Sequence, residues 1–256
     1  MQNNKISFQV YTARKFKPYE DIFKFLSNAG INNIELFEIE PLYKIKELLK
    51  KYNLTALSSH VGFSLLENTQ EVVDKLKILN IKYAIVPCPE PLPGIDFKDN
   101  FNKTEKEWND FGKKLSSYIK FFEDSGLCLG YHNHAFEFNK LASGKMPIEC
   151  ILDQNENLKF EIDIGWTIAG NENPIYWIRK YANRIIACHL KDFYSNNVDF
   201  QNHQNQSAVG DGFIDWNSIL FEIKKTNCRI FALEHDDPKD YKKYILKSLQ
   251  NLNSVL

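Results

Sequence analysis

The sequence predicts a (β/α)8 barrel that takes up all 256 residues as a single domain. Short β-rich runs alternate with longer helical patterns along the whole chain. Successive strands should therefore be parallel, because each crossover between parallel strands needs a helix. The repeat length is about thirty residues, and eight such units are the size of a barrel of about 250 residues. No internal sequence repeat, low-complexity tract or linker divides the chain.

The predicted strands are runs rich in β-branched and aromatic residues. In chain order they cover residues 6–11, 33–37, 54–60, 83–88, 127–134, 158–164, 185–191 and 230–235. A doubly wound open sheet is the alternative fold, and it usually has a glycine-rich phosphate-binding turn after its first strand. The segment "QVYTARKF" contains no glycine, so the barrel is preferred.

Helical segments lie between these strands, and the clearest one begins with a capping box formed by Thr104 and Glu107. Gly126 is placed to end it. Apolar residues recur between these limits at helical spacing: Trp108, Phe111, Leu115, Ile119 and Phe122.

Three later helices have start signals of their own. Two should begin with a proline just after a capping residue, at Asn173-Pro174 and at Asp237-Pro238. A third is expected to start at Asp215. These signals complete the alternation that the barrel requires.

The composition is that of a globular protein, with 43% hydrophobic and 25% charged residues. A formal net charge of -1 gives no reason to expect a nucleic-acid partner. The first residues contain no apolar signal-peptide core, and no run reaches the roughly 18 apolar residues of a membrane span. We therefore expect a cytoplasmic protein with no nucleic-acid or membrane partner. The five cysteines are widely spaced and should be reduced, buried thiols.

The carboxyl ends of the strands carry the active site in a barrel of this type. Five of the six histidines fall at or near predicted strand ends, and only His203 lies in a loop. The polar residues at these ends are of metal-binding or catalytic types: Gln9, Glu35 or Glu38, His60, His132, His134, Asp163, His189, Lys191, Glu234 and His235. Scattered structural histidines would not sort in this way, so we expect one site at the barrel mouth.

The segment "GYHNHAFEF" (130–138) places two histidines two residues apart. Because side chains alternate along a strand, His132 and His134 should point to the same side. Toward the barrel axis, one imidazole can bind a metal ion while the other hydrogen-bonds a substrate. The alternative is a pair of core histidines bonded to backbone carbonyls. Asp163, His189 and Glu234 at three other strand ends favour the metal site.

Five motifs occur in an order that resembles the xylose isomerase-like barrels of the sugar phosphate isomerase/epimerase family: "YHNHAFEF", "EIDIGW", "ACHLKDF", "VGDGFIDW" and "ALEHD". This group includes inosose dehydratase-like enzymes. The segments "SFQVYTAR" and "SSHVGF" also match, so the resemblance covers nearly the whole chain. It implies one divalent metal ion at the barrel mouth, with ligands from strands five to eight, and is compatible with a homo-oligomer.

Carried over residue by residue, the resemblance implies Asp163, His189 and Glu234 as the ligands from strands six, seven and eight. The strand-five ligand is a glutamate in many relatives, whereas the aligned residue here is His132. The resemblance therefore implies His132 as the fourth ligand, with Glu137 in the following loop as the alternative. A mixed carboxylate and imidazole set suits Mn²⁺, Zn²⁺, Fe²⁺ or Co²⁺ better than Ca²⁺.

Other residues near the strand ends are candidates for catalysis or substrate binding. Glu234 is the plain candidate for a base, with His134 or Glu137 as its partner. Lys191 is either a solvated loop residue or an active-site cation that steadies an enolate oxygen. The candidates for substrate binding are His60, Gln9, Glu38 and Trp166, of which Trp166 stands where several epimerase relatives have a histidine.

The chemistry that the resemblance implies is proton abstraction next to a carbonyl, with the metal ion stabilising an enediolate. The first hypothesis is an isomerase or epimerase of a small sugar or sugar derivative. The alternative is a lyase or dehydratase acting on a keto sugar, keto-glycoside or inositol-derived ketone. Two-base epimerases of this fold use a glutamate on strand five, and this chain has His132 there. A lyase needs only one base and a general acid, so His132 favours this alternative. The abasic-site endonucleases share this barrel, but they need three zinc ions and a histidine where this chain has Trp166. A catalytically inactive carbohydrate-binding barrel is the remaining alternative.

Overall fold

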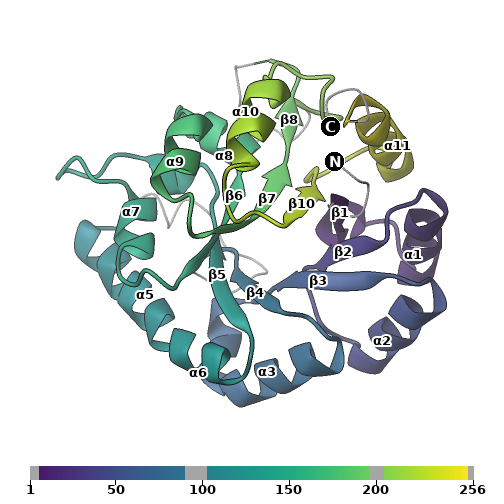
Figure 1. The fold of residues 1–256 in the computed structure, drawn as a ribbon, viewed down its shortest axis with the longest axis horizontal. Coiled ribbons are helices and arrows are strands. Elements are labelled where there is room, and N and C mark those ends of the chain that lie inside the picture. Colours follow the sequence, from purple (N-terminus) through teal and green to yellow (C-terminus); the bar gives the residue numbers. More distant parts are fainter. Residues whose placement is uncertain (1–5, 90–102, 196–204, 253–256) are drawn as a thin grey trace.

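The computed structural model describes residues 6–89, 103–195 and 205–252, and His203 lies outside these ranges. Parallel strands close into a barrel in the order β1-β10-β7-β6-β5-β4-β3-β2 (Figure 1). They are β1 (Ile6–Gln9), β2 (Asn33–Leu36), β3 (Thr55–His60), β4 (Tyr83–Val86), β5 (Cys128–His132), β6 (Lys159–Asp163), β7 (Ile185–Leu190) and β10 (Ile230–Leu233). The (β/α)8 fold and all eight strands are as predicted, and each strand is shorter than predicted at one or both ends.

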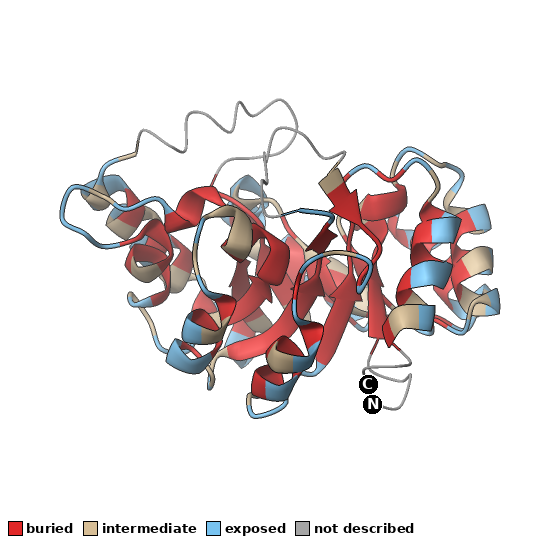
Figure 2. Cartoon of the chain, turned by 90° about the horizontal axis from the view of Figure 1, so that it is seen from above, coloured by how far each residue is buried: buried red, intermediate tan, exposed pale blue. Residues whose placement is uncertain are grey.

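Helices form the outer layer around the strands (Figure 1). They are α1 (Tyr19–Asn28), α2 (Leu42–Lys51), α3 (Thr69–Ile78), α5 (Glu105–Ser117), α6 (Ile119–Asp124), α7 (Pro147–Leu152), α8 (Ile164–Ala169), α9 (Pro174–Lys180), α10 (Trp216–Ile223) and α11 (Tyr241–Leu252). Short 3-10 helices follow three of the strands: η2 (Val10–Ala13), η3 (Phe63–Asn68) and η4 (Phe136–Phe138). The strands are almost wholly buried, whereas the helices alternate buried and exposed residues, as expected of amphipathic helices that cover a sheet (Figure 2).

The capping box of the clearest predicted helix is present. The Thr104 backbone N–H donates to Glu107 Oε2 at 2.7 Å, and the Glu107 N–H donates to Thr104 Oγ1 at 3.3 Å. The predicted helix is divided at Tyr118 into α5 and α6, and Gly126 follows with a φ of 78°. The side chains of Asn173 and Asp215 cap α9 and α10, as predicted.

The predicted helix start at Asp237-Pro238 is wrong, because α11 begins at Tyr241. The Asp240 carboxylate accepts the N–H groups of Lys242 and Lys243 at 3.0 and 3.1 Å and therefore caps the helix. The Asp237 N–H donates to the His235 ring instead, at 3.1 Å.

An apolar cluster fills the barrel interior on the amino-terminal side of the mouth. All its members lie on strands β3, β4, β7 and β10: Leu57, Tyr83, Ile85, Ile186, Ala187 and Ile230. The larger hydrophobic core fills the space between the strands and the helices. Buried polar side chains therefore gather near the carboxyl ends of the strands.

A small antiparallel sheet, β8 (Asp192–Phe193) with β9 (Gln206–Ser207), was not predicted. Asp192 organises the loop that follows, since its carboxylate accepts the Gly210 N–H at 2.9 Å and the Trp216 indole N–H at 2.8 Å. A Cβ atom on Gly212 would collide with the Asp192 carboxylate, so this position requires glycine. The motif "VGDGFIDW" thus forms this loop and the start of α10 (Trp216–Ile223). The Asp236 N–H donates to Gln206 Oε1 of β9 at 2.9 Å.

None of the five cysteines, all within the described ranges, forms a disulfide, and all but Cys128 are fully buried. Among the described helices, none is both long and apolar enough to cross a membrane.

Candidate metal centre and active site

Strand pairing places several candidate site residues side by side. Asp163 of β6 lies opposite His189 of β7, and Glu161 of β6 lies opposite His132 of β5. Because Glu161 and Asp163 are two residues apart, both side chains point to the same side of the sheet, which is the barrel interior.

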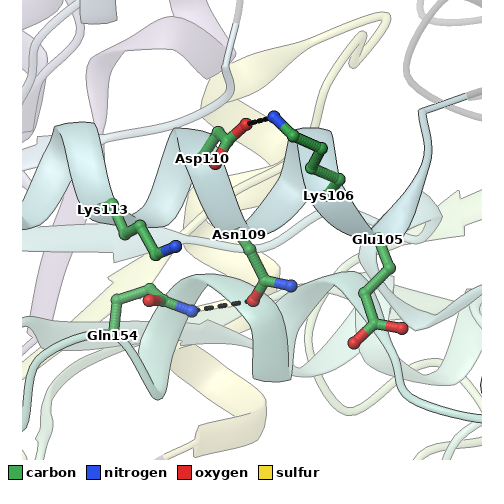
Figure 3. A pocket seen from close by; sticks show the side chains of 6 residues that line it. All are labelled: Glu105, Lys106, Asn109, Asp110, Lys113 and Gln154. Atoms are coloured by element: carbon green, nitrogen blue, oxygen red, sulfur yellow. Dashed lines mark hydrogen bonds and ion pairs between the residues drawn. The ribbon is translucent and has the colours of Figure 1, made fainter.

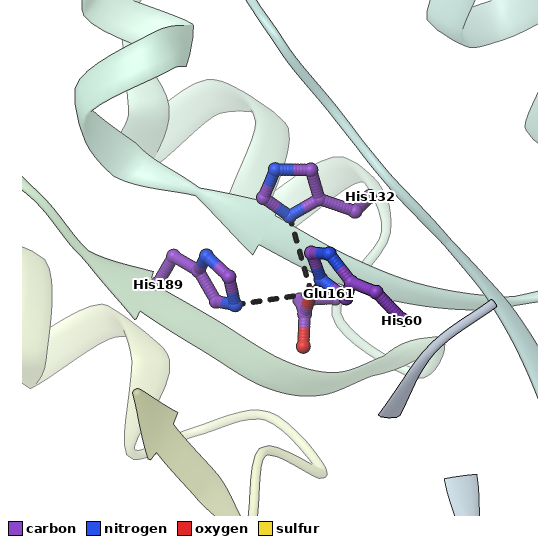
Figure 4. A group of neighbouring side chains, drawn as sticks. All are labelled: His60, His132, Glu161 and His189. Carbon is purple, nitrogen blue, oxygen red and sulfur yellow. Dashed lines mark hydrogen bonds and ion pairs between the residues drawn. The ribbon is translucent and has the colours of Figure 1, made fainter. Parts of the chain in front are cut away.

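The four predicted ligands converge in the structure. One ligand atom each of His132, Asp163, His189 and Glu234 lies within 4.8 Å of the others, and all four residues are buried. A second group with the same closeness shares two of these histidines and adds His60 and Glu161 (Figure 4). The four predicted ligands thus lie together in one cluster, and their role as metal ligands stays a prediction. Glu161 was not among the predicted residues.

Asp163 gives a direct test of whether this set fits a cation. Its Oδ1 accepts the Trp166 N–H at 2.7 Å, whereas its buried Oδ2 has no hydrogen-bond partner among the described residues. The nearest cationic groups to Oδ2 are Lys191 Nζ at 3.6 Å and His189 Nδ1 at 3.8 Å. A buried oxygen without a hydrogen bond is costly, and coordination to a metal ion would satisfy it. Two carboxylates and two imidazoles are a donor set that Zn²⁺, Mn²⁺, Fe²⁺ and Co²⁺ accept.

The two histidines predicted as ligands differ in charge. Burial lowers the pKa of His189, but the charges of Glu161, Glu234 and Glu35 outweigh burial and hold that pKa well above its ordinary value. Burial holds the pKa of His132 well below its ordinary value. His132 is therefore a neutral imidazole that can accept a metal ion, whereas His189 must first lose a proton.

Lys191 is fully buried, so the interpretation as a solvated loop lysine is wrong. Its Nζ lies 2.8 Å from Asp236 Oδ2 and 3.1 Å from Glu234 Oε2, and 4.3 Å from the centre of the Trp166 ring. Burial lowers the pKa of Lys191, but the carboxylates of Asp236, Glu234 and Asp163 outweigh it and raise that pKa above its ordinary value. Lys191 thus holds a positive charge next to Glu234.

Glu137 lies away from the cluster. Its Oε1 accepts the Tyr131 hydroxyl at 2.6 Å, and its Oε2 accepts the His134 N–H at 2.8 Å. Tyr131 packs against Phe111 of α5, on the helix side of β5, and so points away from the barrel interior. Of the two alternatives for the strand-five ligand, the structure brings His132 and not Glu137 into the cluster.

His134 lies beside the ligand histidine, as its spacing suggested. Its ring centre is 5.0 Å from that of His132 and 5.6 Å from that of Phe136, on which it stacks. Burial lowers the pKa of His134 to about 3, so its imidazole is neutral. The Trp166 ring centre lies 6.1 Å from that of His134.

The other candidates for substrate binding occupy different places. His60 lies at the mouth, with 11% of its side chain exposed, and its Nε2 is 2.8 Å from Glu161 Oε2. Gln9 donates to Oε1 of the buried Glu35 at 2.8 Å, and so lies next to a residue that contacts His189. Glu38 is hydrogen-bonded to the Tyr19 hydroxyl and does not reach the cluster. A substrate role for these residues stays a prediction.

Sequence reasoning missed Glu161 and Asp236, and left Glu35 undecided against Glu38. Glu161 lies two residues before Asp163, on the same face of β6. The alternation of side chains along the strand could therefore have pointed to it.

A separate open hollow on the outer helical layer carries no comparable set of groups (Figure 3). It is lined by Glu105, Lys106, Asn109, Asp110, Lys113 and Gln154.

Residues 23–255 match the family model of the xylose isomerase-like TIM barrel. The chain belongs to this family. Inosose dehydratase from Clostridium botulinum (strain Alaska E43 / Type E3) is 29% identical over 147 residues, which are 53% of this chain and 48% of that relative. The chain thus spans about half the length of the curated relatives it matches.

Solved structures share the xylose isomerase-like fold over nearly all of this chain. A sugar phosphate isomerase/epimerase from Parabacteroides distasonis ATCC 8503 superposes with a TM-score of 0.77 at 19% identity, covering 99% of this chain and 96% of that one. The IOLI protein with a bound zinc atom superposes with a TM-score of 0.71 at 16% identity, covering 98% and 97%. At these identities the likeness shows the fold.

Proposed function

We propose that this chain is a divalent-metal-dependent lyase that removes water from a small keto sugar or an inositol-derived ketone. The observation that carries the proposal is the convergence of His132, Asp163, His189 and Glu234 within 4.8 Å at the barrel mouth, with Lys191 beside them. The similarity to inosose dehydratases supports dehydration as the reaction class. A bound divalent ion supplies Lewis-acid polarisation of the carbonyl oxygen.

Glu234 is the proposed base. Burial raises the pKa of Glu234, but Lys191 and His189 outweigh burial and keep that pKa well below its ordinary value, so the side chain is a carboxylate at neutral pH. It is also the most exposed of the four predicted ligands, at 6% of its side chain against 0% for Asp163 and His189. Glu234 takes the proton next to the carbonyl and can return it to the β-hydroxyl group, which then leaves as water. The Lys191 ammonium group provides a positive charge for the oxygen on which negative charge develops.

An epimerase is the second candidate, and His134 favours it. Two-base epimerases need a second proton carrier on the other face of the substrate. The neutral His134 imidazole, whose ring centre lies 5.0 Å from that of His132, is the candidate for this role.

Proton exchange tests and separates these reactions. The metal-loaded protein is incubated in D₂O with a panel of keto-inositols and keto sugars, and the products are followed by NMR. For the lyase we expect an unsaturated product that has lost the hydrogen next to the carbonyl. Deuterium at that carbon in an epimer, without an unsaturated product, would instead identify the epimerase. A panel in which no member gives either an unsaturated product or deuterium exchange would contradict both.

A further inference from the structure

Two buried carboxylates lie next to the ligand histidines on the amino-terminal side of the mouth, and neither is a predicted ligand. Glu161 Oε2 is 2.8 Å from His60 Nε2, 3.1 Å from His132 Nδ1 and 3.1 Å from His189 Nε2 (Figure 4). Glu35 Oε1 is 2.6 Å from the same His189 nitrogen. A histidine that binds a metal ion commonly donates its other N–H to a carboxylate, which fixes the tautomer and the ring orientation.

We propose that Glu161, assisted by Glu35, is a positioning residue that sets which nitrogen each histidine offers to the metal ion, namely Nε2 of His132 and Nδ1 of His189. This inference rests on the metal site of the proposed function. A neutral imidazole carries one N–H donor and one acceptor nitrogen. With Nδ1 of His132 and Nε2 of His189 directed at Glu161, the opposite nitrogens remain for the ion, and Figure 4 shows them turned away from Glu161.

The position of the remaining His189 nitrogen agrees with this assignment. His189 Nδ1 lies 2.9 Å from Glu234 Oε2 and 3.8 Å from Asp163 Oδ2, which are the two predicted carboxylate ligands. The assignment also implies one ion rather than two. A second ion held by His60, His132, Glu161 and His189 would require both shared imidazoles to lose their remaining N–H proton.

Both carboxylates directly follow an irregularity in the strand pairing. The strand register shifts between Ile34 and Glu35 where β2 pairs with β3, and between Phe160 and Glu161 where β6 pairs with β7. Such irregularities redirect a side chain and are common next to active sites. Glu35 is further fixed by hydrogen bonds from Gln9 and Ser58.

The test compares Glu161→Gln with the wild-type protein in two measurements. The first is zinc affinity by competition with a chromophoric chelator. The second is the tautomer of each histidine, from long-range ¹H–¹⁵N spectra of the zinc-loaded protein. Gln keeps the shape of Glu161 but presents an NH₂ group or a weaker acceptor to the imidazole N–H groups. We expect zinc affinity to fall about 10- to 100-fold and the Nδ1–H tautomer of His132 to lose its dominance.

Glu222→Gln is the matched control, because Glu222 is a buried glutamate on α10 that pairs with Arg179 outside the barrel. Its zinc affinity should equal that of the wild type. If Glu161→Gln does not fold, Glu161→Asp keeps the charge and withdraws the oxygen from the histidines, with the same expected loss of affinity. If the wild-type protein binds zinc and the folded Glu161 variant has the same zinc affinity and the same histidine tautomers, the positioning role is overturned and the metal site stands. A wild-type protein that binds no zinc, manganese or cobalt overturns the metal site and this inference together.

Discussion

Glu161 and Glu137 are both fully buried, but they lie on opposite sides of the sheet and differ in protonation. Inside the barrel, burial opposes ionisation of Glu161, yet His189, His132 and His60 hold its pKa well below the ordinary value. On the helix side, the donors to Glu137 are the Tyr131 hydroxyl and backbone N–H groups, among them that of His134, and burial raises its pKa to about 8. Burial alone therefore does not decide the protonation of a carboxylate in this fold, whereas the hydrogen-bond donors and charges around it do.

The largest expected effect lies inside the barrel, at Glu234→Gln. Gln keeps the shape and one oxygen but cannot accept a proton at neutral pH. Turnover should fall by roughly a hundredfold or more, the usual contribution of a positioned base. Metal content should fall only partly, because three ligands remain, and the thermal unfolding curve should hardly change. Exchange of the substrate α-proton at the wild-type rate in D₂O would remove Glu234 from the role of base.

The second prediction concerns the pH dependence of metal binding inside the barrel. The pKa of His189 is held well above its ordinary value by its carboxylate neighbours, and burial raises the pKa of Asp163 to about 7. Both groups must be deprotonated to bind an ion, so binding displaces protons and the apparent affinity rises with pH. We expect an increase of about tenfold per pH unit for each displaced proton between pH 6 and 7. Zinc competition titrations at pH 6, 7 and 8 measure this slope, and an affinity that does not change with pH would contradict the protonation states described above.

The interior of the barrel was largely predictable, because its main features follow from local rules. Alternation of strands and helices predicts the barrel, and the strand ends predict where His132, Asp163, His189 and Glu234 meet. The choice between Glu35 and Glu38 could not be made, because it depends on whether β2 ends at Leu36 or two residues later. The contact between Asp236 and Gln206 joins segments thirty residues apart and has no local signal.

The helix side was less predictable for a physical reason. Glu137 follows the histidine motif so closely that the sequence favours a role at the metal site. Its actual position depends on the turn after β5, where η4 carries its side chain back to Tyr131 and the His134 N–H. Long-range packing against α5, through Tyr131 and Phe111, decides that arrangement.

The third prediction concerns Glu137→Gln, on the helix side of the sheet. The pKa of Glu137 is about 8 in the folded protein, against about 4.3 in an unfolded chain. Between these pH values the folded state binds one more proton than the unfolded state. The contribution of Glu137 to stability is therefore present at low pH and is lost as the pH rises, by about 1.4 kcal/mol per pH unit. Urea unfolding at pH 5, 6 and 7 should show a weaker pH dependence in the variant than in the wild type, with zinc affinity unchanged. Parallel pH profiles for the two proteins would show that Glu137 is ionised when folded.

The smallest expected effect is that of Tyr131→Phe, which removes only the hydroxyl group that donates to Glu137 at 2.6 Å. The ring should keep its packing against Phe111, so the loss is limited to one buried hydrogen bond and costs about 1 to 2 kcal/mol of unfolding free energy. His132 is the next residue in the chain, but its side chain points into the barrel, so zinc affinity and turnover should stay at the wild-type values. Urea unfolding at pH 7 together with a zinc competition titration measures both quantities on the same sample. A fall in zinc affinity that accompanies the loss of stability would mean that the two sides of β5 are coupled. Glu137 on the helix side could then not be treated as independent of Glu161 and the proposed metal site inside the barrel.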